Sequence, residues 1–263
     1  MHLELWQWAL VVIAAMLVGV SKTGIIGLGV LFVAIFSNVL PTKLASGFVL
    51  PLLIFGDVVA VASYRLHAQW RFIWRLFPWT AAGVVLGYLA MGRIDDRQAR
   101  LLVGAIVCAM VTMYAARRWR GPGKRMAAAG GQTTDGGGRT QKEEEAYGIW
   151  FAPTVGVLAG FTTLVANAAG PLMALYMLAM GLPKMEYVGT GAVFFLLLNL
   201  FKVPFMAHLG LITPDSFGVN LALAPAVGLG AWAGRKVLPH INQRWFENLA
   251  LGLAAVAGLH LLF

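Results

Sequence analysis

The chain has 263 residues, of which 59% are hydrophobic and 12% are charged, and its mean hydropathy is +0.76. Charged residues occupy about 25% of the positions in soluble globular domains, so this composition excludes an ordinary soluble domain and predicts a membrane protein with several crossings. The formal net charge is +9, but the basic residues lie between apolar segments rather than along one soluble face. We therefore expect a lipid bilayer, and not a nucleic acid, as the partner of these residues.

The first apolar region covers residues 5–38 and contains Gly-Val-Ser-Lys-Thr-Gly at positions 19–24. No Lys or Arg precedes it, so we do not expect a cleaved signal peptide, and the region should stay in the mature protein. As one continuous helix it would be about 50 Å long, whereas the hydrocarbon core of a bilayer is about 30 Å thick. The polar run is therefore expected to break the helix inside the membrane.

A second apolar region of this kind covers residues 149–180 and contains Gly-Phe-Thr-Thr-Leu-Val-Ala-Asn-Ala-Ala-Gly-Pro at positions 160–171. Unpaired backbone is tolerated within a bilayer only where protein or a water-filled cavity satisfies it, so two breaks at membrane depth indicate a binding site. Each region is either a broken helix that crosses once or a hairpin that returns to the side it entered.

The other apolar runs have the length of plain membrane crossings, about 20 residues each. They cover residues 44–63, 72–91, 98–116, 188–207, 216–236 and 245–262. The sequence thus predicts an all-α polytopic membrane protein in which two broken segments accompany six plain crossings.

A polar stretch at residues 117–147 separates two halves of the chain. It begins with a basic run at residues 117–125 and continues through glycine-rich and glutamate-rich segments. Such a composition is typical of a flexible linker that does not pack into a core. We therefore expect a first membrane repeat at residues 1–116, a cytoplasmic linker, and a second membrane repeat at residues 148–263.

The two halves resemble one another at a constant offset of 142 positions. This offset aligns Leu40-Pro41 through Gly47 with Leu182-Pro183 through Gly189, and it places Asp57 on Asn199. Apolar segments interrupted at matching places in two repeats are the best sequence indication of a transporter's substrate site. The sequence therefore predicts two homologous repeats whose broken segments lie at equivalent positions.

The distribution of Lys and Arg favours an inverted relation between the halves. If both broken segments are re-entrant hairpins, each half crosses three times and the linker side carries fourteen basic residues against four. If each broken segment crosses once, there are eight crossings and the counts are ten and eight. The positive-inside rule favours the first arrangement, and the second stays open.

The first break carries a candidate anion site built from Ser21, Lys22 and Thr23. A cation inside an apolar segment costs about 2.5 to 3.5 kcal/mol on insertion scales and usually faces a cavity or a partner. With hydroxyls and free backbone N–H groups beside it, Lys22 would form a donor-rich cup for a small oxyanion. The alternative is that Lys22 neutralises Asp57 structurally.

The second break adds Thr162, Thr163 and Asn167, which are neutral hydrogen-bonding groups. One positive charge among neutral donors suits an anion that must be released again. The alternative for either threonine is a hydrogen bond to its own helix.

Two further charged residues, Asp57 and Arg65, have candidate roles in coupling or gating. Asp57 lies deep in an apolar segment, so it is expected either to take up a proton or to hold Lys22 in place. Arg65 follows at the end of that crossing and is more often an interface anchor than a ligand. Lys202 lies near the end of a segment, where we expect its amine to extend to the membrane surface.

Enzymatic and metal sites are not indicated by the sequence. The five histidines lack the spacing of a metal site, and Lys22 does not stand in the Gly-rich context of a phosphate-binding loop. Ser21 and Lys22 are adjacent, so their side chains diverge and do not form a hydrolytic pair. We expect no enzyme activity, no cofactor and no bound metal.

Taken together, the runs at positions 19–24 and 160–171, Asp57 with Tyr64-Arg65, and Leu-Pro-Lys-Met-Glu-Tyr-Val-Gly-Thr at positions 182–190 resemble the TauE/SafE family of sulfite and organosulfonate exporters, a group of sulfur-anion permeases. The resemblance covers nearly the whole chain and both repeats. It implies a multi-pass carrier in the bacterial cytoplasmic (inner) membrane that moves sulfite, sulfoacetate or related sulfonates.

The sequence therefore predicts a secondary transporter that exports a small sulfur-containing anion held between two broken segments at mid-membrane. A channel-like anion facilitator is the alternative within transport, and a membrane scaffold whose glycines only permit close helix packing is the alternative outside it. Protons are the candidate coupling ion, and a homo-oligomer is compatible with the sequence. The sequence does not fix the identity of the anion or the direction of transport.

Overall fold

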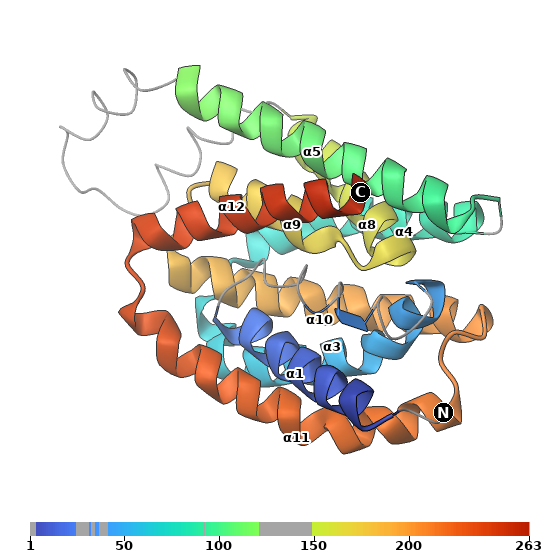
Figure 1. The fold of residues 1–263 in the computed structure, drawn as a ribbon. Coiled ribbons are helices and arrows are strands. Elements are labelled where there is room, and N and C mark those ends of the chain that lie inside the picture. Colours follow the sequence, from blue (N-terminus) through green and yellow to red (C-terminus); the bar gives the residue numbers. More distant parts are fainter. Residues whose placement is uncertain are drawn as a thin grey trace.

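The computed structural model describes residues 4–24, 32, 35–36, 42–91, 93–120 and 149–262. Regular secondary structure in these residues is entirely helical, as predicted (Figure 1). The elements are α1 (Leu5–Thr23), α3 (Thr42–Tyr64), η1 (Arg65–His67), α4 (Trp70–Met91), α5 (Asp96–Arg120), α8 (Phe151–Ala166), α9 (Ala169–Ala179), α10 (Lys184–His208), α11 (Pro214–Val237), η2 (Leu238–His240) and α12 (Gln243–Leu262).

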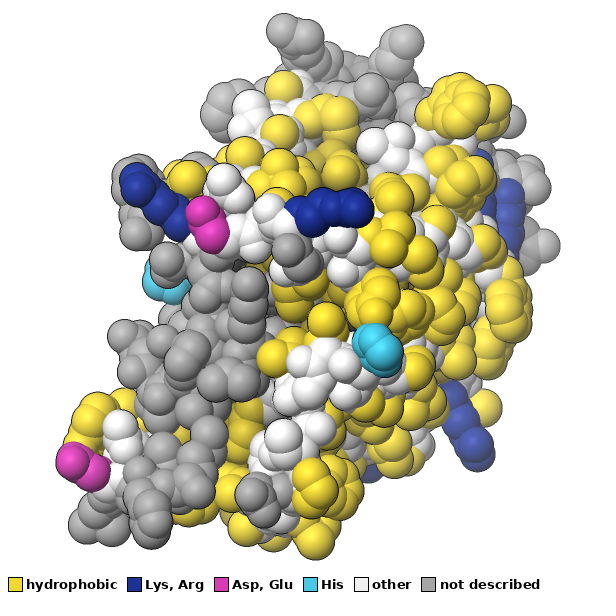
Figure 2. All heavy atoms as spheres, turned by 90° about the vertical axis from the view of Figure 1, so that its right-hand side faces the viewer, with side chains coloured by type: hydrophobic (Ala, Val, Ile, Leu, Met, Phe, Trp, Pro, Cys, Tyr) yellow, Lys and Arg dark blue, Asp and Glu magenta, His cyan; other side chains and the backbone are white. Residues whose placement is uncertain are grey.

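Among the described residues, five helices are long and apolar enough to cross a membrane, namely α1, α3, α4, α10 and α11. Four of these correspond to expected crossings, and α1 contains the first part of the first broken region. The expected crossings at residues 98–116 and 245–262 form helices α5 and α12, but neither is among the five. Hydrophobic side chains cover much of the described surface on the side seen in Figure 2, and charged ones are scattered there.

Helices α3 and α10 pack against each other at the centre of the molecule (Figure 1). Their contacts run in opposite order along the two helices. Gly189 near the start of α10 lies against the backbone of Tyr64 at the end of α3. Asn199, later in α10, contacts Asp57, which is earlier in α3. The two helices are therefore antiparallel. Asp57 and Asn199, which touch each other, are the pair that the offset of 142 positions aligns.

Two other pairs of helices pack closely through glycine: α1 with α11, and α8 with α4. A Cβ atom at Gly19 would lie 2.0 Å from the carbonyl oxygen of Val227 in α11, and one at Gly160 would lie 2.0 Å from the carbonyl oxygen of Thr80 in α4. In both pairs, later residues of one helix contact later residues of the other, so each pair is parallel. Small residues at these crossings let the helix backbones approach to direct contact.

The second broken region is interrupted between α8 and α9. Helix α8 ends at Ala166, and Asn167 follows with a φ angle of 51°, in the left-handed region. Of the non-glycine residues, asparagine is among those that adopt this conformation most readily, and it commonly ends a helix. The N–H groups of Asn167 and Ala168 bond to the carbonyls of Thr163 and Thr162, which closes the helix end.

The first broken region is described only in part. Helix α1 ends at Thr23 and is capped by Gly24, whose N–H bonds to the carbonyl of Val20. The position of this helix end agrees with the predicted break at residues 19–24, and most of residues 25–38 lie outside the described chain. Helix α5 continues to Arg120, so residues 117–120, which the sequence analysis assigns to the linker, are helical. The remainder of the expected linker, residues 121–147, lies outside the described residues.

Candidate anion-binding site

An ion pair joins the end of α1 to the middle of α3. Lys22 Nζ lies 2.8 Å from Asp57 Oδ1, and the two side chains are 11% and 0% exposed. The other carboxylate oxygen of Asp57 accepts a hydrogen bond of 2.6 Å from Asn199 Nδ2 on α10. Both oxygens of the buried carboxylate therefore have a partner, as a charge removed from water requires.

Space for the lysine at this point depends on a glycine. A Cβ atom at Gly56, the neighbour of Asp57, would lie 3.1 Å from Lys22 Cγ. The ammonium group also lies 4.5 Å from the centre of the Phe195 ring on α10, within the range of a cation–π interaction. Helices α1, α3 and α10 thus hold the lysine from three sides.

A second ammonium group lies at the break between α8 and α9. Lys202 on α10 is 0% exposed, and its Nζ donates hydrogen bonds of 2.6 Å to Asn167 Oδ1 and 3.2 Å to Thr163 Oγ1. Both partners are neutral. Among the residues that the structure describes, no carboxylate lies within 4.0 Å of this amine.

The side chain of Asn167 connects this lysine to α3. Its Nδ2 donates to the carbonyl oxygen of Ser46 at 3.0 Å and to the Ser46 hydroxyl at 3.2 Å. Ser46 and Asp57 are eleven residues apart in α3, which is close to three helical turns, so they share one face of that helix. The same face of α3 therefore carries Asp57, which pairs with Lys22, and Ser46, which accepts from Asn167.

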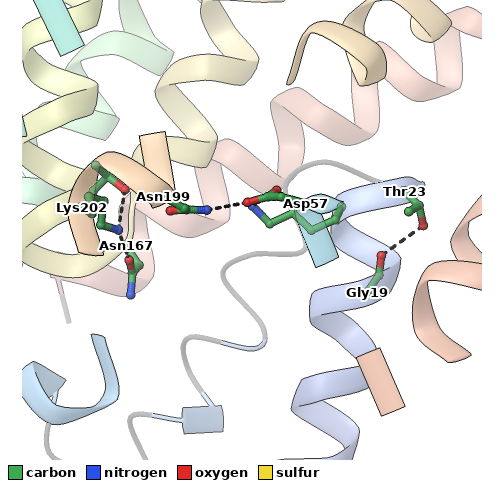
Figure 3. A network of polar contacts seen from close by, with 8 residues as sticks. Gly19, Thr23, Asp57, Asn167, Asn199 and Lys202 are labelled. Atoms are coloured by element: carbon green, nitrogen blue, oxygen red, sulfur yellow. Dashed lines mark hydrogen bonds and ion pairs between the residues drawn. The ribbon is translucent and has the colours of Figure 1, made fainter. Parts of the chain in front are cut away.

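Helix α10 also brings the ion pair and the second ammonium group together. Asn199 and Lys202 are three residues apart in this helix, so their side chains leave the same face. Figure 3 shows the resulting row of polar side chains, in which Asn167 and Lys202 lie on one side and Asn199 and Asp57 continue it towards α1. A polar chain thus passes through an apolar interior from the end of α1 to the α8–α9 break.

Three other residues that the sequence analysis named, Thr23, Thr162 and Arg65, lie apart from this row. The Thr23 hydroxyl donates to the carbonyl of Gly19 at 3.1 Å (Figure 3). It also donates to the carbonyl of Ala231 at 2.7 Å and so joins α1 to α11. The Thr162 hydroxyl donates to the carbonyl of Ala159 in its own helix. Ser21 is buried, and Arg65 is exposed in η1, where α3 ends.

The expectation that Lys202 reaches the membrane surface is wrong. Its side chain turns into the protein because α3 packs beside α10 and the α8–α9 break offers the oxygen acceptors Asn167 Oδ1 and Thr163 Oγ1. One feature of the sequence is consistent with the inward direction. Lys202 follows Asn199 by three residues, so the two share a helix face, and Asn199 aligns with Asp57, which was expected to lie deep in the membrane. Ser46, which the sequence analysis did not name, also belongs to the row.

No group of three or more His, Cys, Asp or Glu side chains suited to a metal ion occurs within the described ranges. The polar row instead contains two ammonium groups, one carboxylate, and neutral amides and hydroxyls. Such a set can bind an anion through charge-assisted hydrogen bonds.

Comparison with protein-family models decides the family. The model described as sulfite exporter TauE/SafE matches residues 11–261. The chain belongs to the TauE/SafE sulfite exporter family. Searches of curated proteins and of solved structures gave no match. Members of the TauE/SafE family are membrane transporters and not enzymes, so this TauE/SafE chain is a multi-pass membrane transporter for small anions.

Proposed function

We propose that this TauE/SafE protein is a secondary transporter that exports small sulfur-containing oxyanions, such as sulfite, sulfoacetate or other sulfonates, across the bacterial cytoplasmic membrane. The family match supports the sulfur-anion class. The observation that carries the proposal is the buried polar row, in which Lys22 and Lys202 stand against a single described carboxylate, Asp57. Excess positive charge in an apolar interior is stabilised when an anion enters.

The proposed site lies where the α8–α9 break meets α3, α10 and the end of α1. Thr163 and Asn167 provide neutral groups from the break, and Lys22 and Ser21 lie at the end of α1. We assign Asp57 the task of holding Lys22, because the carboxylate lies 2.8 Å from the ammonium group. Thr23 and Thr162 are left out of the proposed site, since backbone carbonyls already accept from their hydroxyls.

We further propose that the two halves are inverted repeats. The support is the antiparallel packing of α3 and α10, which occupy equivalent places 142 positions apart. If α4 and α5 each cross the membrane once, the chain reaches α8 on the side where α5 ends. Helix α10 then runs opposite to α3 only if the α8–α9 segment enters from that side and returns to it. This topology also gathers fourteen of the basic residues on the linker side, as the positive-inside rule favours.

The function is tested by the stability of the purified protein in the presence of sulfite, thiosulfate, sulfoacetate, taurine, sulfate and chloride. We expect a raised melting temperature with one or more of the sulfur-containing anions and none with chloride, because a ligand that binds only the folded state stabilises it. Equal shifts with every salt, or no shift with any, would contradict the proposal.

A further inference from the structure

We infer that Lys202 is the residue that binds the charged headgroup of the transported anion, and that the site accepts a singly charged oxyanion such as a sulfonate. This inference rests on the proposed function and adds the binding residue and the charge of the substrate. Lys22, the more conspicuous lysine in the sequence, then belongs to the fixed framework.

The first step is that Lys22 is already neutralised. Asp57 Oδ1 lies 2.8 Å from its ammonium group, and Asp57 Oδ2 accepts from Asn199. These three side chains form a unit with no net charge. An anion that approached Lys22 would have to compete with a buried carboxylate at contact distance.

The second step is that Lys202 is not neutralised by any described side chain. Its amine is fully buried and bonds to the neutral oxygens Asn167 Oδ1 and Thr163 Oγ1. A buried ammonium group with neutral partners is stabilised much less than a paired one. The single excess charge of the polar row is therefore located at Lys202.

The third step concerns hydrogen-bond donors beside that charge. The Thr163 hydroxyl accepts from Lys202 and can itself donate to an oxyanion, whereas Asn167 Nδ2 already donates to Ser46 and holds Asn167 in place. The oxygens of a sulfonate headgroup can accept from the ammonium group and from this hydroxyl at the same time. A sulfonate therefore matches the donors beside Lys202 and its single charge.

The charge count predicts selection between anions. A singly charged headgroup leaves the row neutral, because Lys22 and Asp57 already cancel. A doubly charged anion such as sulfate leaves one uncompensated negative charge in the apolar interior, where isolated charges are strongly disfavoured. We therefore expect a preference for monoanions over dianions of similar size, so that among the proposed substrates simple alkanesulfonates should bind more tightly than sulfoacetate, whose carboxylate adds a second charge at neutral pH.

A purely structural role is the competing explanation for Lys202. In that case the amine only fastens α10 to the α8–α9 break through Asn167 and Thr163. A neutral hydrogen-bonding side chain would fasten the break without placing a charge there, and the variant Lys202→Gln separates the two roles. Lys202→Arg keeps the charge and tests whether charge restores binding.

The experiment measures binding of ethanesulfonate and of sulfate to purified full-length protein in lipid nanodiscs, by calorimetry. We expect wild type to bind ethanesulfonate more tightly than sulfate, Lys202→Gln to lose about tenfold or more in ethanesulfonate affinity, and Lys202→Arg to recover part of it. The double variant Lys22→Gln/Asp57→Asn removes the ion pair without changing the net charge, and we expect it to lose less affinity than Lys202→Gln. Melting temperatures without ligand identify any variant that has not folded.

Unchanged ethanesulfonate affinity in folded Lys202→Gln would overturn the inference while leaving the proposed function intact. The inference would also fail if the Lys22→Gln/Asp57→Asn variant lost as much affinity as Lys202→Gln, or if wild type bound sulfate as tightly as ethanesulfonate. If Lys202→Gln does not fold, the inference is tested by the ratio of ethanesulfonate to sulfate affinity in Lys202→Arg and in wild type. A preference for sulfate in both proteins would contradict the inference. Absence of binding by sulfite and by every sulfonate in wild type would instead refute the proposed function.

Discussion

Single residues in the polar row have different tasks although they share one interior. Asp57 and Lys22 form a compensated pair, whereas Lys202 relies on neutral acceptors. Paired charges support the framework, and an unpaired one is available to a ligand. This difference leads to separate predictions for stability and for binding.

Removing the carboxylate alone is expected to destabilise the protein. Asp57→Asn leaves Lys22, whose side chain is 11% exposed, without a counter-charge, and breaking a buried pair in this way costs about 3 to 5 kcal/mol. Lys22→Gln/Asp57→Asn should recover much of that stability because no isolated charge remains. Thermal unfolding in detergent measures both variants, and equal melting temperatures of Asp57→Asn and wild type would exclude the framework role of the pair.

The neighbouring threonines of α8 provide a matched comparison. Thr163→Val removes a hydroxyl that accepts from Lys202, whereas Thr162→Val removes one that bonds only its own helix at Ala159. Each substitution keeps a β-branched side chain of similar shape. We expect Thr163→Val to weaken ethanesulfonate binding severalfold and Thr162→Val to leave it unchanged, in the calorimetric assay, and the reverse order would place the site elsewhere.

At the scale of single residues, part of the polar row was predictable from the sequence. Lys22, Asp57, Thr163 and Asn167 stand out because polar residues are rare in apolar segments, and the pairing of Lys22 with Asp57 was a stated alternative. The inward direction of Lys202 was not predictable from its segment, because it depends on α3, which packs beside α10, and on acceptors at the end of α8, and both come from distant parts of the chain.

At the scale of whole helices, the positions of helix ends and helix crossings depend on a few residues. The break between α8 and α9 depends on the left-handed conformation of Asn167, and the helix pairs α1–α11 and α8–α4 depend on glycine contacts. The sequence placed both breaks within short runs, because polar and small residues interrupt an apolar helix. It could not identify which helices the glycines contact, since that requires the packed structure.

The break itself is tested by comparing two substitutions at one position. Asn167→Gly keeps the left-handed backbone accessible and removes only the amide, whereas Asn167→Ala removes the amide and adds about 1 kcal/mol of backbone strain. We expect both to lower ethanesulfonate affinity and the alanine variant to melt at the lower temperature. Equal or higher stability of Asn167→Ala would show that the φ angle of 51° is not required for the fold.

Close packing of α8 on α4 is tested through Gly160. Alanine at this position would bring its Cβ to 2.0 Å from the Thr80 carbonyl oxygen, while the matched position Gly228 in α11 has open space around it. We expect Gly160→Ala to lower the free energy of unfolding by about 1 to 3 kcal/mol through overpacking and Gly228→Ala to have little effect. Similar unfolding curves for the two variants would contradict the described crossing.

At the scale of the whole molecule, helices α3 and α10 pack antiparallel, and residues 142 positions apart in the sequence meet at Asp57 and Asn199. The sequence predicted an all-α membrane protein because its apolar runs are long and sparsely charged. Two crossings expected from hydropathy, α5 and α12, are not among the five long apolar helices of the described chain. Hydropathy alone does not decide whether such borderline helices cross the membrane.

Inverted repeats are tested by cysteine labelling from outside intact cells, in a background where Cys108 is replaced. His240→Cys and Lys184→Cys lie on the linker side in the inverted topology, so a membrane-impermeant maleimide should not reach them, whereas Arg93→Cys should be labelled. Labelling of both linker-side positions from outside would exclude the inverted arrangement.

The central claim is that the buried ammonium group of Lys202 serves the passage of a sulfur-containing anion. Efflux of labelled ethanesulfonate from proteoliposomes, measured with and without unlabelled ethanesulfonate on the opposite side, tests it most directly. We expect saturable flux with counterflow in wild type and loss of both in Lys202→Gln. Flux through wild type that neither saturates nor shows counterflow, or saturable flux that Lys202→Gln retains in full, would contradict the account.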